Sequence, residues 1–512
     1  MHADILIING KCLAVSNQET YDWIAVTDNN ISAAGRGEDY NSIICNPEKI
    51  IDAKRCTVLP GFYDSHFHLV QTGINSLSLD LSEAASFNDI GDLIQEQAGL
   101  TPGQPIRGIR LYESNLKEKR FPDRIVLDKF CNDVPVWLCS REYHTSILNT
   151  YAILHYKIPF TLSGIDLDHK NMPTGIFRHH ANALLRENIL KSITTAYRLE
   201  AVSGVSEDVL KKGITTINSM EGGYLFCDKD AEFVHEYGKS FPVDIVLFYQ
   251  TTNISRIKEM NLKRIGGSLF VDGSFGSRNA ALFFEYNDKP GCMGELFFDQ
   301  DDLNAFLVDC YKNRLQTALH TIGGRAIEMA LNAHEHALNI VGEIGLRHRL
   351  EHVEMPTAEH ISRSKKLGLI YSMQPTYEYL WGGPSKMYAE RLGEHYKTTN
   401  PLREIVEGGI TVCGGSESDV TQPDPLLGIH AAVNHPVKEH RMEVMDAIRM
   451  FTVNGAYAVF EDQKKGGLET GKLADIVILD HDILTTPKDR IKDIKVKTTI
   501  KSGCILFDSD KQ

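Results

Sequence analysis

The 512 residues carry a formal net charge of −14 at pH 7, and 42% of them are hydrophobic. A chain of this length and composition can bury a large core and is typical of a globular protein with more than one domain. The acidic balance argues against nucleic-acid binding, which needs concentrated Lys and Arg, and no apolar run approaches the length of a membrane span. The ten cysteines form no CxxC pair and no signal-peptide pattern opens the chain, so we expect a cytoplasmic protein with reduced cysteines.

Short strands separated by turn signals are predicted at both ends of the chain. They are expected at residues 4–9, 12–15, 23–27, 30–34 and 50–52, and again at 474–480 and 495–507. Neither group is a convincing sheet with a core of its own. We therefore expect residues 1–57 and 468–512 to pair into one small composite β-sandwich domain that draws on both termini.

Apolar strand-like runs alternate with helical runs from residue 60 onward, which indicates βα units and a parallel sheet. The predicted strands are 62–68, 214–219, 243–249, 268–272, 316–320, 346–352, 369–374 and 410–416. Two of the helices between them are predicted at 325–340 and 443–460. Eight strands are the number that a TIM-like (β/α)8 barrel requires, so residues 58–74 and 206–467 are assigned to a barrel.

Residues 75–205 depart from this alternation and are predicted to form an inserted α/β subdomain. Extra strands are expected at 106–112 and 135–140. Helices are expected at 87–99, 145–155 and 181–202. Insertions of this kind extend loops at the C-terminal face of a barrel, where they shape the access of substrate.

The first barrel strand ends in His66-Phe67-His68. Side chains two residues apart on a strand project from the same face, so the two imidazoles could reach one divalent metal ion. For an isolated pair, a surface strand that carries His-x-His by accident would be the better interpretation.

Further strand ends strengthen the metal interpretation. His320 and His352 end the predicted strands five and six, and Glu417 and Asp419 follow strand eight. The carboxyl ends of barrel strands meet at one rim, and four imidazoles with a carboxylate are ligands that a catalytic zinc takes.

With these residues in place, the chain resembles the amidohydrolase superfamily, in the branch of N-substituted formamide deformylase-like enzymes. The motifs that carry the resemblance are Pro60-Gly-Phe-Tyr-Asp-Ser-His-Phe-His68 and residues 141–144, 173–175, 213–216, 271–276, 320–323, 349–352, 374–375, 415–417, 424–428 and 471–476. The resemblance implies a barrel with a composite β domain, in agreement with the pattern of strands.

The resemblance also implies roles for the residues at the barrel rim. His66, His68, His320 and His352 are expected as metal ligands or close neighbours. Glu417 stands where the family usually has an Asp that binds the metal and moves the proton of the attacking water, with Asp419 as the alternative.

Two positions depart from the family pattern. Ser268 stands where many two-metal relatives carry a carboxylated Lys, and Gly324 where an Asp usually follows the strand-five motif. One divalent ion, with zinc favoured, is therefore expected. Two ions are the alternative if a carboxylate such as Glu221 or Asp272 substitutes, although Glu221 is equally well interpreted as a solvated loop residue.

Other residues are assigned to the pocket with an ordinary structural role as the alternative. In the family the residue equivalent to His144 faces the active site and could polarise a carbonyl; the alternative is capping of a following helix. Asp272 is expected to orient a metal-bound histidine through its second ring nitrogen. Tyr377, Tyr379 and Trp381 are expected to line a hydrophobic pocket or lid, with ordinary packing as the alternative.

These features predict a metal-dependent hydrolase that cleaves an amide, cyclic amide or N-acyl/N-formyl C–N bond of a small molecule. A non-hydrolytic isomerase, lyase or decarboxylase on the same barrel is the first alternative. A non-catalytic binding protein is the second, but four unused buried imidazoles would carry a desolvation cost. A homodimer is the default expectation for the assembly.

Overall fold

A computed structural model describes residues 2–17, 19–141, 143–223 and 226–511, which fall into two compact units. The first unit combines residues 1–69, 205–223 and 231–512, and the second combines 70–204 and 224–230. The division into three domains expected from the sequence stays a prediction.

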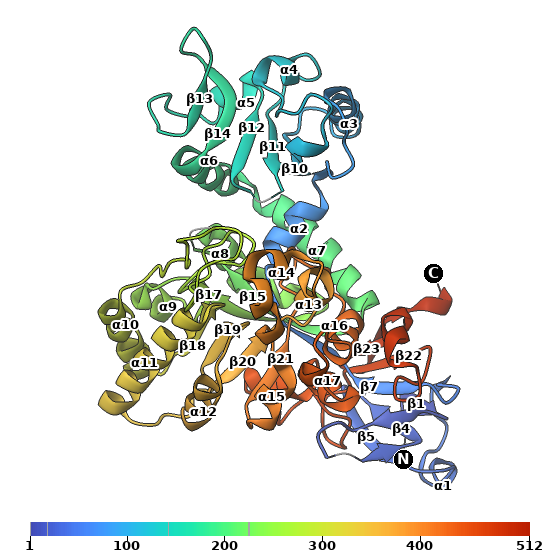
Figure 1. Cartoon of the computed structure of the whole chain (residues 1–512). Coiled ribbons are helices and arrows are strands. Elements are labelled where there is room, and N and C mark those ends of the chain that lie inside the picture. Colours follow the sequence, from blue (N-terminus) through green and yellow to red (C-terminus); the bar gives the residue numbers. More distant parts are fainter. Residues whose placement is uncertain (1, 18, 142, 224–225, 512) are drawn as a thin grey trace. The chain divides into compact units, whose positions relative to one another are not determined.

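Within the described part of the first unit, eight parallel strands form one sheet, and helices surround it (Figure 1). In sheet order they are β8 (Phe62–Phe67), β15 (Ile214–Glu221), β16 (Asp244–Tyr249), β17 (Arg264–Phe270), β18 (Gln316–Thr321), β19 (Arg349–His352), β20 (Ile370–Met373) and β21 (Thr411–Gly414). The segment after β21 returns to β8 through a parallel bridge between Phe67 and Ser418. The backbone N–H of Glu417 donates to the His66 carbonyl at a distance of 2.7 Å, which closes the sheet at this rim. The predicted barrel is thus confirmed.

The fourth strand begins earlier than the sequence pattern suggested. We expected residues 268–272, whereas β17 spans Arg264–Phe270 and its register against β18 shifts between Gly266 and Leu269. Gly266 and Gly267 have φ of 92° and 98°, and a Cβ at Gly266 would stand 2.2 Å from the Ala318 carbonyl oxygen. A glycine pair that resembles a turn is here a bulge inside a strand.

The composite β domain joins strands from both ends of the chain, as predicted (Figure 1). One sheet runs β5 (Asn30–Gly35), β4 (Trp23–Thr27), β1 (Ile5–Ile8) and β6 (Lys49–Asp52), and the other runs β24 (Cys504–Asp508), β23 (Val496–Lys501), β22 (Ile476–Leu479), β7 (Thr57–Pro60), β2 (Lys11–Leu13) and β3 (Thr20–Tyr21). β22 pairs antiparallel with β7, which leads directly into the first barrel strand. Ile5, Val58 and Ile476 share one core, so burial of apolar surface ties the two termini together.

The second unit is an α/β body of its own. Its sheet runs β13 (Ile165–Leu167), β14 (Pro173–Arg178), β12 (Thr145–Leu148), β11 (Val136–Ser140), β10 (Ile106–Leu111) and β9 (Leu79–Asp80). Its helices are α2 (Leu69–Ser76), α3 (Phe87–Leu100), α4 (Arg124–Asp128), α5 (Thr150–His155), α6 (His179–Ser192) and the first part of α7 (Thr195–Lys211). The two extra strands expected from the sequence are confirmed in β10 and β11.

Two predicted helices of the second unit are wrong in detail. Residues 145–155 split into β12 and α5, because Asn149 caps α5 by accepting a hydrogen bond from the Ala152 N–H. Residues 181–202 split into α6 and α7, with Ile193 in an extended conformation between them. A cap or a single extended residue ends a helix without changing its apolar pattern.

The barrel helices follow the prediction more closely. α11 (Gly324–Val341) is confirmed, whereas residues 443–460 divide into α17 (Val444–Met450) and α18 (Val453–Ala458) at Thr452. The other helices are α1 (Tyr40–Ile43), α8 (Asp228–Tyr237), α9 (Ile254–Glu259), α10 (Gln300–Lys312), α12 (Ala358–Lys366), α13 (Thr376–Trp381), α14 (Met387–Leu392), α15 (Leu402–Glu407) and α16 (Pro425–Val433). Among the described residues, no helix combines the length and the apolar character needed to cross a membrane.

Candidate metal centre

The ends of four barrel strands bring the predicted rim residues together. His66 lies near the end of β8 and His68 follows it; His320 lies near the end of β18, and His352 ends β19. Glu417 follows β21 and is held beside β8 by its backbone bond to His66. All five side chains belong to residues that are at most 8% exposed. The carboxyl ends of these strands therefore place four imidazoles and one carboxylate in a single buried region.

Three of these residues have the spacing of a metal site. His66, His68 and Glu417 each offer one ligand atom, and the three atoms lie within 4.8 Å of one another. The rings continue the cluster, since the centroids of His66 and His352 are 4.9 Å apart and those of His352 and His320 are 4.3 Å apart. Two histidines and a carboxylate suit zinc and other divalent metals.

Each imidazole is oriented by a hydrogen bond through one ring nitrogen. The pairs are His66 Nδ1 with Glu351 Oε2 at 2.7 Å, His68 Nδ1 with the Met220 carbonyl at 2.9 Å, His352 Nδ1 with Gln374 Oε1 at 2.7 Å, and His320 Nε2 with the Gly273 carbonyl at 3.3 Å. Because each acceptor takes an N–H, the opposite nitrogen presents a lone pair.

Several of the opposite atoms are buried without a hydrogen bond. Within the described residues, Nε2 of His66, Nε2 of His352, Nδ1 of His320 and Oε2 of Glu417 have no hydrogen-bond partner. Buried polar atoms without partners carry a desolvation cost, and a metal ion would remove it. The residues of the rim therefore fit a divalent metal.

The protonation states agree with metal binding. Burial, reinforced by neighbouring imidazoles, lowers the pKa of His66 and His352 well below the usual value for histidine. Burial also lowers the pKa of His320 to about 4. The rings are therefore neutral at pH 7, which is the form that donates a lone pair to a metal.

The carboxylates indicate a shortage of positive charge at the rim. Burial, and then the neighbouring carboxylate of Glu354, raises the pKa of Glu417 well above its usual range. Burial likewise raises the pKa of Glu354 to about 8. Two acidic groups that resist ionisation together would be stabilised as carboxylates by a cation between them and the imidazoles.

The two candidates for the strand-eight carboxylate have different surroundings, although the charge of Asp419 acts on both His68 and Glu417. Glu417 groups with His66 and His68, whereas Asp419 is not part of that group within the described residues and is partly exposed. The backbone bond between Glu417 and His66 fixes this arrangement at the closure of the barrel.

Asp272 does not have the expected contact with a histidine. Its carboxylate accepts backbone N–H bonds from Ile322, Gly323 and Ala281 at 2.9, 2.7 and 2.8 Å. Asp272 Oδ1 lies 4.0 Å from His320 Nε2, and the hydrogen bond of that nitrogen goes to the Gly273 carbonyl instead. Asp272 therefore does not make the expected hydrogen bond, because the backbone amides of Ile322, Gly323 and Ala281 take up its oxygens, and its role in orienting His320 stays a prediction.

The two positions that depart from the family pattern are tightly enclosed. Ser268 is 1% exposed, and its hydroxyl oxygen has no hydrogen-bond partner in the described part of the chain. Gly324 begins α11 against the ring of Phe283, which a Cβ would meet at 2.6 Å. Gly324 has no side chain to bind a second ion, and the Ser268 hydroxyl cannot form the bridging carbamate that the resemblance associates with a lysine at this position.

Two other candidates have different surroundings from those expected. Glu221 is the last residue of β15 and fully buried, so it is not a solvated loop residue; its Oε1 accepts a hydrogen bond from Ser219 Oγ at 2.6 Å. His144 belongs to the second unit and precedes β12. The alternative of helix capping is wrong because a strand follows His144, and its catalytic role stays a prediction.

The residues that support the imidazoles were missed in the sequence. Glu351 and Gln374 belong to the motifs at 349–352 and 374–375 but were given no role, although each contacts a rim histidine. Arg349 and Glu351 stand two residues apart on a short, fully buried strand, and this pair of opposite charges was the available signal. Tyr377 packs beside the site, with its ring parallel to that of His352 at a centroid distance of 6.4 Å.

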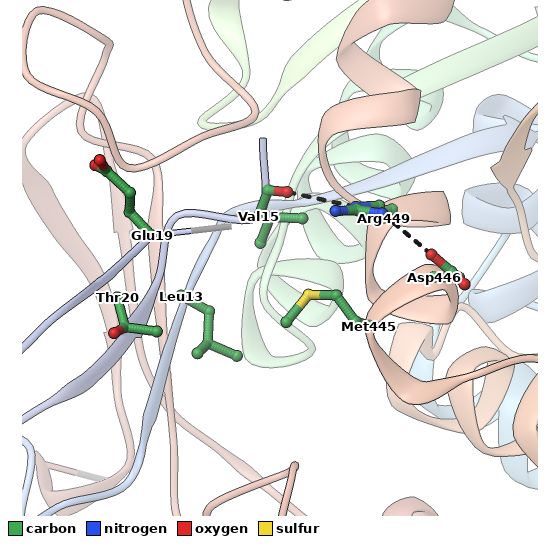
Figure 2. Close-up of a pocket in the computed structure, with 7 residues that line it drawn as sticks. All are labelled: Leu13, Val15, Glu19, Thr20, Met445, Asp446 and Arg449. Atoms are coloured by element: carbon green, nitrogen blue, oxygen red, sulfur yellow. Dashed lines mark hydrogen bonds and ion pairs between the residues drawn. The ribbon is translucent and has the colours of Figure 1, made fainter. Parts of the chain in front are cut away.

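A surface pocket of about 380 Å³ lies elsewhere in the first unit, where β2 faces α17. Figure 2 shows its lining, with Arg449 reaching the Val15 carbonyl on one side and Asp446 on the other. Its residues are Leu13, Val15, Glu19, Thr20, Met445, Asp446 and Arg449. None of the rim residues lines this pocket, so it is separate from the histidine cluster.

A closed parallel barrel with neutral histidines and a carboxylate at its C-terminal rim defines the class of metal-dependent hydrolases. Comparison with protein families makes the assignment specific. The model of the amidohydrolase family matches residues 49–507, so the chain belongs to this family.

Individual relatives resemble the chain along nearly its whole length. It is 26% identical to the protein LONG AFTER FAR-RED 3 of Arabidopsis thaliana, over 93% of this chain and 87% of that one. It is 24% identical to the N-substituted formamide deformylase of Arthrobacter pascens, over 99% and 98% of the two chains. The crystal structure of an uncharacterized metal-dependent hydrolase from Pyrococcus furiosus superposes with a TM-score of 0.79 at 24% identity, covering 94% of this chain and all of the other, and shows the same fold.

Proposed function

We propose that the protein hydrolyses an amide, cyclic amide or N-acyl/N-formyl C–N bond of a small molecule. The observation that carries the proposal is the convergence of ligand atoms from His66, His68 and Glu417 within 4.8 Å, at the catalytic rim of the barrel. Membership of the amidohydrolase family supports the hydrolytic class. The similarity to a formamide deformylase supports a C–N bond as the target.

The residues present would hold one divalent ion, for which zinc is favoured. His66, His68 and Glu417 would be its ligands, with His320 and His352 as further ligands or close neighbours. When bound, such an ion supplies a Lewis acid and lowers the pKa of water from about 16 towards about 7. A single ion is favoured because Ser268 cannot form a bridging carbamate and Gly324 has no side chain to bind a second ion.

Glu417 acts as the general base in this proposal. Its carboxylate accepts a proton from the attacking water and then donates it to the leaving nitrogen. His144 is proposed to stabilise the developing oxyanion by hydrogen bonding. His352 donates from Nδ1 to Gln374 Oε1 and has no second N–H to offer, so its proposed role is that of a metal ligand or close neighbour. Gln374 fixes the His352 ring by accepting from Nδ1 at 2.7 Å, and Glu417 Oε2 lies 3.5 Å from the same Nδ1.

The test is turnover of N-formyl, N-acyl and cyclic amides by zinc-loaded protein in water enriched in oxygen-18. We expect one labelled oxygen in the carboxylate product, loss of turnover after chelation and recovery on adding zinc. Turnover without label would instead support the isomerase, lyase or decarboxylase alternative. Purified protein that neither contains nor binds a divalent metal would contradict the proposal and favour a non-catalytic binding protein.

Two further expectations from the sequence stay predictions. A cytoplasmic location agrees with the free cysteines among the described residues, several of which are buried. A homodimer is the default assembly, and light scattering of the purified protein tests it.

A further inference from the structure

A fully buried ion pair lies directly behind His66. Arg349 Nε donates to Glu351 Oε1 and Arg349 Nη2 donates to Glu351 Oε2, each at a distance of 2.8 Å. The same Oε2 accepts the hydrogen bond of His66 Nδ1 at 2.7 Å. The side chains of all three residues are 0% exposed. One carboxylate therefore connects a guanidinium to the ring that offers Nε2 to the metal.

The guanidinium is itself fixed in place. Arg349 Nη2 donates to the Ser65 carbonyl at 2.6 Å, and the group lies 4.7 Å from the centre of the Phe248 ring. Ser65 is adjacent to His66 in β8, so the pair joins strand six to the backbone of strand one at the level of the metal ligands. Neither Arg349 nor Glu351 can turn away without breaking a buried hydrogen bond.

His66 differs from the other rim histidines in the kind of acceptor it has. His68 and His320 bond to backbone carbonyls, and His352 bonds to the amide of Gln374. Of these four hydrogen bonds, the one from His66 is made to a carboxylate. A carboxylate holds the tautomer more firmly than a neutral acceptor and makes the opposite nitrogen a better electron donor.

We propose that the Arg349–Glu351 pair is the positioning device of the metal centre, which sets the affinity for the metal by holding His66 as its Nε2 ligand. The inference rests on the proposed function, because it concerns the same metal site. Burial of an ion pair of this kind is by itself weak evidence for stability. Its contact with His66, which contributes a ligand atom to the cluster, gives it a functional reason.

Replacement of Glu351 by Gln removes the negative charge of the carboxylate but keeps the shape of the side chain. The amide can offer its oxygen to His66 only if its NH2 group faces Arg349 Nε, where two donors oppose each other. In the other orientation the NH2 group faces His66, which must then accept at Nδ1 and carry its proton on Nε2, the metal-binding nitrogen. Both orientations weaken the ligand.

The experiment measures zinc affinity of the metal-free protein by competition with a chromogenic chelator. We expect E351Q to bind zinc roughly 10- to 100-fold more weakly than the unchanged protein. D230N is the matched control, because Asp230 and Arg198 form a comparable buried ion pair at 2.7 Å with no rim histidine. The control is expected to lose stability to urea but to keep its zinc affinity within about twofold.

A second readout and a second variant keep the inference open to refutation. Nitrogen-15 NMR of the metal-free protein is expected to show His66 protonated on Nδ1 in the unchanged protein and altered in E351Q. If E351Q does not fold, R349M retains the carboxylate but removes its two anchoring bonds, and a smaller loss of affinity is expected. Zinc affinity of the folded variant within twofold of the unchanged protein overturns the inference, whereas failure of the unchanged protein to bind zinc refutes the proposed function instead.

Discussion

Buried polar groups differ in their hydrogen bonding and ion pairing between the two ends of the barrel. At the C-terminal rim, within the described residues, His66 Nε2, His352 Nε2 and Glu417 Oε2 are buried without a hydrogen-bond partner. At the N-terminal end, Lys465 is 3% exposed, donates to Thr216 Oγ1 at 3.0 Å and pairs with both Asp244 and Glu461. The rim brings several unpartnered ligand atoms together, whereas the Lys465 cluster pairs its charges, although His348 Nε2 at this end is also buried without a partner in the described part of the chain.

This difference indicates that the C-terminal rim carries the groups available for metal binding and catalysis, whereas the cluster at the N-terminal end contributes to stability. Unpartnered buried atoms carry a free-energy cost that a bound ion can offset, so they mark a binding site. The Lys465 cluster holds strands β15 and β16 to the segment after α18, and Tyr63 from β8 joins it through a hydrogen bond to Glu461 at 2.9 Å. Changes at the rim should therefore alter metal binding and catalysis, and changes at the other end should alter unfolding.

The largest effect is expected for His66→Ala. It removes one of the three ligand atoms that lie within 4.8 Å, and the hydrogen-bond partner Glu351 is left facing a cavity. Zinc affinity should fall by more than about 100-fold, the upper end of the loss caused by removing a partner behind a ligand. Zinc content after gel filtration measures this, and retention of one equivalent would break the assignment of the rim as the metal centre.

The next effect is expected for Glu417→Gln. Loss of the general base should lower kcat by roughly 100- to 10,000-fold while the histidines still bind zinc weakly. Asp419→Asn is the matched comparison, since that carboxylate lies two residues on and outside the ligand group. If kcat falls in D419N but not in E417Q, Asp419 is the strand-eight carboxylate and the proposed role of Glu417 is wrong.

Most of the fold could be predicted because buried strands appear in the sequence as recognisable apolar runs. Strands covered on both faces appear as continuous apolar runs, and all eight barrel strands could be located in this way. The errors occurred where backbone conformation outweighs the apolar pattern. The glycine pair at 266–267 concealed the start of β17, and Asn149 and Thr452 divided segments that seemed to be single helices.

The candidate site could be predicted only in part, for a similar reason. His66, His68, His320 and His352 stand at strand ends, and the topology of a parallel barrel brings strand ends together. The support of each ring depends on contacts between distant strands. Glu351 lies 285 residues from His66, and no local pattern states that these two side chains meet. Asp272 shows the converse, because a plausible partner in sequence is held by backbone amides instead.

A smaller effect is expected at the opposite end of the barrel for Lys465→Met. The change leaves Asp244 and Glu461 without their shared cation, but both carboxylates are partly exposed, so the loss in free energy of unfolding should be about 2–3 kcal/mol rather than the larger value of a fully buried pair. Urea denaturation measures it. Zinc affinity and kcat per folded molecule should stay unchanged, and a parallel loss of zinc would show that the two ends are not independent.

The smallest effect concerns pH and the metal-free protein. The pKa of His320 is lowered from 6.5 to about 4 in the folded state, so the unfolded chain binds more protons as the pH falls. The corresponding stability is complete above pH 6.5 and is lost as the pH falls towards 4. Between pH 6.5 and 5.5 this residue should account for about 1 kcal/mol of the decrease in the free energy of unfolding.

Comparison of variants isolates the contribution of His320 from that of other buried groups. H320Q should show a shallower decrease between pH 6.5 and 5.5 than the unchanged protein, whereas K465M should show the same decrease, since a lysine does not change its charge in this range. Zinc should steepen the pH dependence because protons and metal compete for the imidazoles. Equal slopes for H320Q and the unchanged protein would mean that His320 is not held neutral by burial, and the contrast between the two ends would then rest on the hydrogen bonds alone.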